Sequence, residues 1–158
     1  MADLKAVRLN QFESLLRQFM MRVCEDNMHS IPLGLSMEKI FTVNESMLAG
    51  KVGSGSVDVL ATPVMIVLME NVAAECIAEY ITEDMTSVGT EISINHCGAT
   101  PVGMQVVIKA SVMQVKNGRT IMFDLEARDE VEVVGKGTHT RVIVDKEKFE
   151  KNARSKGL

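Results

Sequence analysis

The sequence predicts an α+β domain in which an antiparallel sheet curls around one long, buried helix. A helix that is apolar around most of its circumference begins at Thr62-Pro63. Strand-like patterns with a period of two follow it over residues 88–144, and Asn117-Gly118 between two of them is a strong hairpin signal. A sheet wrapped around that helix would bury it, and its free edges favour pairing with a second copy across a two-fold axis.

Length and composition are those of one globular domain. The chain has 158 residues, of which 46% are hydrophobic and 24% charged. The net charge of -4 argues against general binding of nucleic acid, which needs a basic surface. There is no Trp, one Tyr and five Phe, so aromatic platforms for stacking bases are scarce.

Neither a membrane span nor an export signal is expected. No run of about 18 apolar residues occurs, and polar side chains interrupt the apolar residues of the first 28 positions. The three cysteines (Cys24, Cys76 and Cys97) are odd in number and form no C-x-x-C pair, which argues against a disulfide framework or a metal site. These features predict a reducing, cytoplasmic setting.

A second helix is expected before the main domain. Apolar residues recur at spacings of three and four over about residues 4–25, namely Leu9, Phe12, Leu16, Phe19 and Val23. We therefore divide the chain into an N-terminal helical extension, residues 1–33, and a main domain, residues 34–158. The stripe would pack on this domain or on a partner subunit.

The remaining elements of the main domain follow from local patterns. Residues 39–43 predict a strand, and the glycines and serines of residues 45–61 predict a loop or lid. Thr62 is expected as the N-cap of the buried helix, with Pro63 as its first residue. Further strands are predicted at 88–96, 104–116, 119–129 and 131–144, and a charged helix at 146–154. In the first of these four, one face would carry Val88, Thr90, Ile92, Ile94 and His96.

Glu70 is the most informative polar residue of the buried helix. Its neighbours three and four positions away are Ile66, Val67, Ala73 and Ala74, which offer it neither a cation nor a hydrogen bond. A carboxylate beside an apolar stripe pays a desolvation cost unless another element supplies a partner, and such an environment suits a general base. The alternative is a glutamate that reaches water or a distant arginine.

Three further positions have both a structural and a functional interpretation. His96 ends the inward face of its strand, so it is either a satisfied core residue or the partner of Glu70 in an acid–base pair. Thr62 either caps the helix or lies where the free N–H groups of a helix N-terminus bind an oxyanion. Arg141 shares a strand face with His139, either to meet a carboxylate or phosphate or to lie at the surface. Gly135 and Gly137 in that strand indicate a bulge or a close backbone approach.

Five short motifs follow one another in a characteristic order. They are Ala61-Thr62-Pro63, Leu68-Met69-Glu70, Val88-Gly89-Thr90, His96 with Ala99-Thr100-Pro101-Val102-Gly103, and Gly135-Lys136-Gly137-Thr138-His139. In this order and spacing, roughly residues 37–150 resemble the hotdog-fold acyl-CoA thioesterases, and among them the fluoroacetyl-CoA thioesterase-like branch. The resemblance implies a hotdog fold, a homodimer with its active site at or near the subunit interface, and hydrolysis of a short-chain acyl-CoA thioester.

The same resemblance implies roles for individual residues. Thr62, Glu70 and His96 match the family's catalytic positions, the Gly89 amide would hold the thioester oxygen, and Arg141 would bind near the substrate. Coenzyme A enters only as part of the substrate, so no separate cofactor is implied. Residues 50–58 contain no aromatic residue where the fluoroacetyl-specific relative uses a Phe as a gate, which argues against selectivity for fluoroacetyl-CoA.

Two other functions are compatible with these residues. One is hydration or dehydration of an acyl thioester, a hotdog reaction that also uses a histidine with a carboxylate. The other is a non-catalytic, dimeric acyl-CoA-binding protein. The N-terminal stripe needs a surface to cover, so an assembly larger than a dimer stays open.

Overall fold

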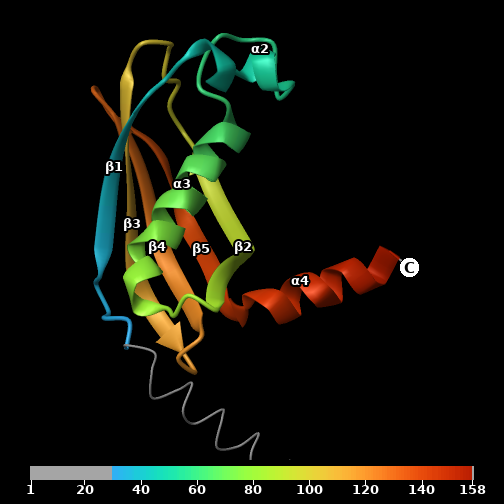
Figure 1. Cartoon of the computed structure of the whole chain (residues 1–158). Coiled ribbons are helices and arrows are strands. Elements are labelled where there is room, and N and C mark those ends of the chain that lie inside the picture. The colour runs from blue at the N-terminus through green and yellow to red at the C-terminus, as the bar shows by residue number, and fades with distance from the viewer. Residues whose placement is uncertain (1–29, 158) are drawn as a thin grey trace, which may run out of the picture. The chain divides into compact units, whose positions relative to one another are not determined.

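A five-stranded antiparallel sheet forms the body of the protein. The computed structural model describes residues 30–157, so the predicted helix at 4–25 and most of the extension at 1–33 lie outside the described residues. The strand order across the sheet is β1-β3-β4-β5-β2, which leaves β1 and β2 at the edges (Figure 1). The strands are β1 (Ser36–Thr42), β2 (Met85–His96), β3 (Gln105–Lys116), β4 (Thr120–Asp129) and β5 (Val133–Asp145).

The helix α3 (Thr62–Cys76) lies along one face of this sheet, as predicted (Figure 1). The residues that it buries are all apolar, namely Met65, Leu68, Met69, Val72, Ala73 and Cys76. A short 3-10 helix, η2 (Ala78–Tyr80), follows it and leads to β2. Burial of these side chains against the sheet stabilises the fold by about 25 cal/mol per Å² of apolar surface removed from water.

The central strands bury alternate residues, as expected for a sheet with one covered face. In β4 these are Ile121, Phe123, Leu125 and Ala127. The turn between β3 and β4 has φ values of 51° at Asn117 and 64° at Gly118. Two consecutive residues with positive φ are the requirement of a tight type I′ hairpin, which is why Asn-Gly predicts this turn correctly.

A β-bulge changes the faces predicted for β2. Gly89 pairs with Arg141 and Glu91 with Thr140, so Thr90 is an extra residue in this strand. The prediction that Val88 and Thr90 share a face with Ile92 is therefore wrong. The bulge turns Gly89 toward α3 instead, and it does so where β2 passes Glu70.

The segment between β1 and α3 is more ordered than the predicted loop. It contains the 3-10 helix η1 (Glu45–Met47) and the short helix α2 (Ala49–Val52). Isolated bridges join Leu48 to Leu60 and Val59 to Pro101. Ala61, rather than Thr62, occupies the N-cap of α3, so the predicted capping role of Thr62 is wrong and its hydroxyl is free for another partner.

The glycines of β5 allow the close approach that the sequence indicates. A Cβ at Gly135 would lie 2.7 Å from the Met65 sulfur on α3, and one at Gly137 would collide with the Ser93 carbonyl oxygen. Side chains here would push the helix away from the sheet or separate β5 from β2.

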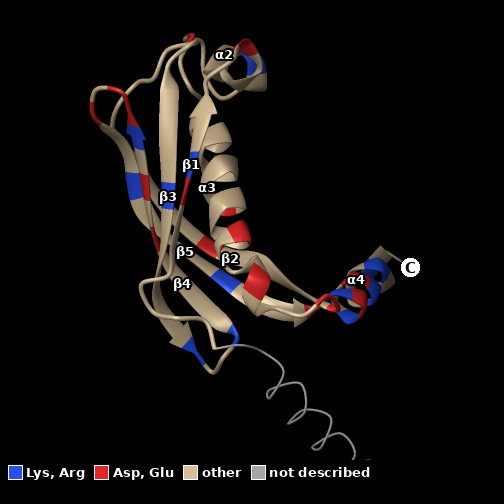
Figure 2. Cartoon of the chain, turned by 60° about the vertical axis from the view of Figure 1, so that its left-hand side comes forward, with Lys and Arg blue, Asp and Glu red and all other residues tan. Residues whose placement is uncertain are grey.

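The helix α4 (Lys146–Arg154) begins directly after β5. The Asp145 side chain accepts a hydrogen bond from the Lys148 amide at 2.8 Å and so caps the helix. None of its residues is buried, and it extends away from the sheet, with both basic and acidic positions along it (Figures 1 and 2). Across residues 30–157, no helix has the length and hydropathy that a membrane span requires.

Candidate active site

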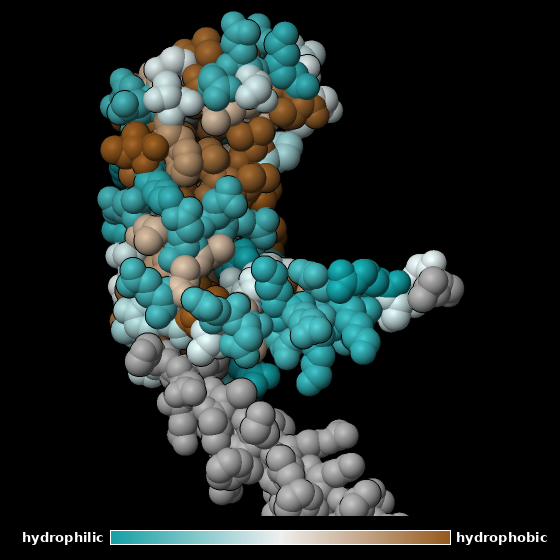
Figure 3. Space-filling model, viewed as in Figure 1, coloured by the Kyte–Doolittle hydropathy of each residue, from teal (hydrophilic) through white to brown (hydrophobic). Residues whose placement is uncertain are grey.

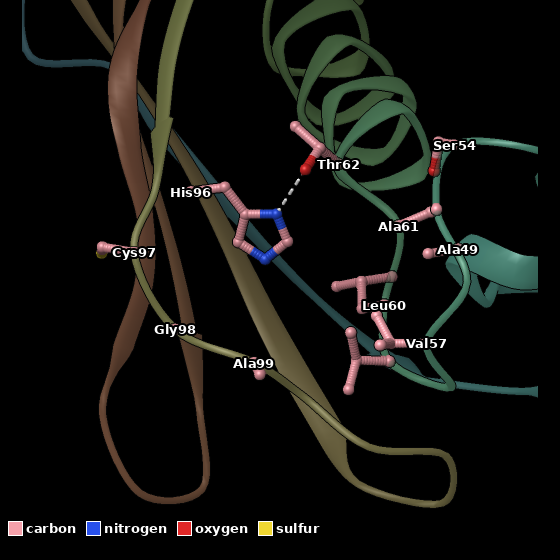
Figure 4. Close-up of a pocket in the computed structure, with 12 residues that line it drawn as sticks. Ala49, Ser54, Val57, Leu60, Ala61, Thr62, His96, Cys97, Gly98 and Ala99 are labelled. Carbon is pink, nitrogen blue, oxygen red and sulfur yellow. Dashed lines mark hydrogen bonds between the residues drawn. The ribbon is translucent and has the colours of Figure 1, made fainter.

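Thr62 and His96 form one polar pair at the N-terminal end of α3. The Thr62 hydroxyl and His96 Nδ1 are 2.7 Å apart, which joins the first residue of α3 to the last residue of β2 (Figure 4). The strand alternation that predicted an inward His96 therefore holds at this end of β2. Proline at position 63 fixes the start of the helix and with it the position of the hydroxyl.

The other ring nitrogen of His96 is a buried atom without a partner. Among the described residues, Nε2 makes no hydrogen bond, although it is shielded from solvent. Burial lowers the pKa of the imidazole, and the nearby Gly98 backbone opposes this shift only in part. The ring is thus neutral near pH 7. A buried, unpaired nitrogen is costly, and a ligand atom at this place would satisfy it.

A cavity of about 410 Å³ opens beside this pair. The loop before α3 forms one wall, and the chain just after β2 forms the other (Figure 4). Most of the lining is small and apolar, including Ala49, Val57, Val59, Leu60, Ala61 and Ala99. An apolar cavity with a few convergent polar atoms is the usual form of a small-molecule site.

Glu70 lies two turns further along α3, in a second polar cluster. Its Oε1 is 3.5 Å from His139 Nε2 and 4.0 Å from Arg141 Nη1, and its side chain is 39% exposed. No hydrogen bond or ion pair joins Glu70 to His96 in the described part of the chain. The cation that α3 itself lacks is supplied by β5, which corresponds to the distant arginine considered from sequence.

Arg141 is buried, with 8% exposure, and most of its donors are already engaged. Nε donates to the Ser87 hydroxyl at 2.9 Å, and Nη2 donates to the Ser87 carbonyl at 2.7 Å. Nη1 lies 3.1 Å from His139 Nε2. Burial lowers the pKa of the guanidinium, and the Glu70 carboxylate acts in the opposite direction.

Gly89 belongs to the same cluster. A Cβ at this position would overlap Glu70 Oε1 and lie 3.0 Å from His139 Cε1. Only glycine therefore leaves Glu70 its observed place beside the sheet. The five residues singled out from sequence thus fall into two groups: Thr62 with His96, and Glu70 with Gly89 and Arg141.

His139 received no role from the sequence, although it is the most buried charged or polar group of the second cluster. Its exposure is 1%, and Nδ1 lies 2.8 Å from the Glu91 carbonyl oxygen. The signal that could have found it is its position two residues before Arg141, on the same face of one strand. Burial lowers its pKa most, the Arg141 charge lowers it further, and the Glu91 hydrogen bond and Glu70 charge oppose these effects.

No metal centre accompanies these groups: over residues 30–157, no three His, Cys, Asp or Glu side chains converge as metal ligands would. Cys76 is buried and Cys97 is exposed, and both are free thiols.

Comparisons of the sequence and of the fold with known proteins point to the same class of enzyme, the thioesterases. The family model described as fluoroacetyl-CoA-specific thioesterase matches residues 43–147. A fluoroacetyl-CoA thioesterase of Streptantibioticus cattleyicolor is 36% identical over 99 residues, covering 63% of this chain and 70% of that one. A solved structure of a fluoroacetyl-CoA thioesterase superposes with a TM-score of 0.77 at 28% identity, over 81% of this chain and 98% of the other.

A point variant of that enzyme has been solved in complex with fluoroacetate and CoA. It matches with a TM-score of 0.72 and 29% identity, over 75% of this chain and 99% of the other. Together these likenesses define a hotdog-fold thioester hydrolase. The chain belongs to the fluoroacetyl-CoA-specific thioesterase family.

Proposed function

We propose that this protein hydrolyses short-chain acyl-CoA thioesters to the free acid and CoA, with Thr62, Glu70 and His96 as its catalytic residues. The observation that carries the proposal is the unpaired Nε2 of His96 beside an apolar cavity at a helix N-terminus. Family membership and the CoA complex of a relative support acyl-CoA as the substrate. The mostly apolar lining of the cavity favours an aliphatic acyl group.

The first turn of α3 suits the charge that develops in the reaction. Attack on a thioester carbonyl places negative charge on its oxygen, and the free N–H groups and positive dipole end of a helix stabilise such charge. Thr62 holds His96 through Nδ1, which leaves Nε2 for the substrate or for the attacking water. Gly89 and Arg141 remain the proposed substrate-side contacts near Glu70. The reaction needs no cofactor, and CoA arrives as part of the substrate.

The proposed reaction uses Glu70 and His96 together, although the two side chains lie in separate clusters within one chain. Eight residues of helix separate Thr62 from Glu70, which is about 12 Å of axial rise. A homodimer in which two α3 helices lie antiparallel across a two-fold axis would bring Glu70 of the partner subunit to Thr62 and His96.

Surface features of the sheet and helix support such a dimer. Among the strands of residues 30–157, β2 is an edge strand, and one side of its backbone faces no other strand. The side of α3 that faces away from the sheet carries apolar residues too, with Val67 52% exposed and Val64 and Ile66 half-buried. Apolar residues gather on the face between α2 and α4 in Figure 3. A second copy covering this face would remove them from water.

Mixing two inactive variants tests the cross-subunit site. Glu70→Gln and His96→Ala are purified separately, and their subunits are then exchanged. If one site uses residues of both chains, each hybrid dimer regains one intact site, and about a quarter of the wild-type activity returns. No recovery after proven exchange would mean that Glu70 and His96 act within one chain or do not act together.

Thiol release from acetyl-, butyryl-, hexanoyl- and octanoyl-CoA tests the activity itself. We expect turnover of the shorter thioesters and little preference for fluoroacetyl-CoA. Water addition to an enoyl-CoA without thiol release would instead show a hydratase, and tight binding of acyl-CoA without any reaction would show a binding protein. In a single turnover in isotopically labelled water, label in Glu70 would show that its carboxylate attacks the thioester first and that water then attacks the Glu70 carbonyl of the mixed anhydride.

The acyl-CoA substrate and the absence of a cysteine framework also lead us to propose a cytoplasmic location. Fractionation of the source cells, with the protein traced by antibody, would test this location.

A further inference from the structure

His139 lies at the centre of the second cluster, with β2, β4 and the Glu70 side chain of α3 around it. Phe123 of β4 stacks on its ring with the centroids 6.4 Å apart, and Ile92 of β2 is its partner across the sheet. Its Nδ1 is 2.8 Å from the Glu91 carbonyl oxygen. A carbonyl can only accept, so the hydrogen of the neutral ring must be on Nδ1.

This tautomer determines what Nε2 can do. Without a hydrogen, Nε2 accepts from Nη1 of Arg141, which is 3.1 Å away. The same Nη1 lies 4.0 Å from Glu70 Oε1, while Nε and Nη2 of the guanidinium bind Ser87. Ser87 and His139 thus fix the Arg141 side chain from two sides. In this position, Nη1 of the guanidinium faces the Glu70 carboxylate.

We propose that His139 is a positioning residue for Glu70: its neutral, Nδ1-protonated ring holds the Arg141 guanidinium in place, and Arg141 holds the Glu70 carboxylate ready for the thioester. The role rests on the proposed thioesterase function, in which Glu70 takes part. In this role, His139 acts through Arg141 and does not touch the substrate.

The charges around the ring agree with this assignment. Among the described residues, Glu70 from α3 and Arg141 from β5 are the charged groups that face it, and the polar contact from β2 is the Glu91 carbonyl. Burial and the Arg141 charge lower the pKa of His139. A protonated ring would donate to Glu70 from Nε2 and could no longer accept from Arg141, so acid would dismantle the arrangement.

Two isosteric variants separate positioning from simple anchoring. Glutamine at 139 places an amide near the Nε2 position and keeps an acceptor for Arg141, whereas asparagine reaches only the Nδ1 position and keeps the bond to Glu91. Positioning predicts that His139→Asn lowers kcat for acetyl-CoA about thirtyfold and His139→Gln about threefold. Anchoring of the sheet through Glu91 predicts the reverse order, which would overturn the proposal. Thr138→Val, on the outer face of β5, is the control and should match wild type.

Nitrogen NMR of the imidazole tests the arrangement without any activity. We expect the Nδ1–H tautomer at neutral pH, and a lower His139 pKa in Glu70→Gln because the carboxylate charge that raises it is gone. An Nε2–H tautomer in the wild-type protein would overturn the proposal even if the His139 variants fail to fold. A His139 pKa that is unchanged in folded Glu70→Gln would also overturn it. If wild-type protein shows this NMR signature but releases no thiol from any acyl-CoA, the proposed function fails while the contacts stand.

Discussion

Gly89 of β2 and Glu70 of α3 occupy adjoining space, so that a single methyl group on residue 89 would overlap the Glu70 carboxylate. The bulge at Thr90 turns residue 89 toward the helix, and the lack of a side chain there lets the carboxylate lie against the strand. The absence of a Cβ at Gly89 thus allows the Glu70 carboxylate, a proposed catalytic group, to take its position.

Gly89→Ala should impair catalysis more than folding. The nearest obstacle to the new methyl group is the end of a flexible side chain, so Glu70 can move aside and the sheet can stay intact. We expect kcat for acetyl-CoA to fall about tenfold or more, since misplacing a reacting group by an ångström is costly, with a small change in Tm. Gly50→Ala is the matched control, because a Cβ there has no neighbour nearer than 3.8 Å. Equal kcat values for the two variants would show that the place of Glu70 does not matter.

Thr62→Val should remove the hydrogen bond to His96 while keeping the shape of the side chain. Loss of one hydrogen bond to an active imidazole corresponds to about 1.5 kcal/mol, or roughly tenfold in kcat. Thr62→Ser keeps the hydroxyl and should retain most of the activity. Because Ala61 rather than Thr62 caps α3, neither change should lower Tm by more than a degree or two. A valine variant with a large loss of Tm would point to a structural role for Thr62.

Local signals account for the parts of the fold that the sequence predicts well. The Asn117-Gly118 turn and the apolar circumference of α3 depend on neighbouring residues only, and both are found as expected. The bulge in β2 depends on pairing with β5. The alternating pattern of the β2 sequence continues through the bulge and therefore does not reveal it. The same limit applies to the candidate site: spacing along α3 identified Glu70 as unpartnered, but only the packing of β5 against α3 reveals its contacts with His139 and Arg141.

Acid should destabilise the protein in the range where histidine titrates. Burial lowers the pKa values of His96 and His139 in the folded state, whereas the unfolded chain has the ordinary value of about 6.5. Between the folded and unfolded values the unfolded chain binds more protons, so the free energy of unfolding falls as the pH decreases below about 6.5. Thermal unfolding followed at pH 7 and at pH 5.5 should show a lower Tm at pH 5.5. In the variant His139→Gln the difference should shrink, and a Tm independent of pH would contradict this account.

Val57→Phe should shift the preference of the enzyme toward shorter acyl groups. Val57 lines the cavity and is 57% exposed, so a larger side chain can extend into the space beside Thr62 and His96 without disturbing the core. Filling apolar space excludes long chains more than an acetyl group, and one methylene is worth about tenfold or more in such discrimination. We therefore expect kcat/KM for hexanoyl-CoA to fall at least about tenfold relative to acetyl-CoA. Val52→Phe is the control, because Val52 is also exposed but does not line the cavity. If both substitutions leave the ratio unchanged, the acyl chain does not occupy this cavity.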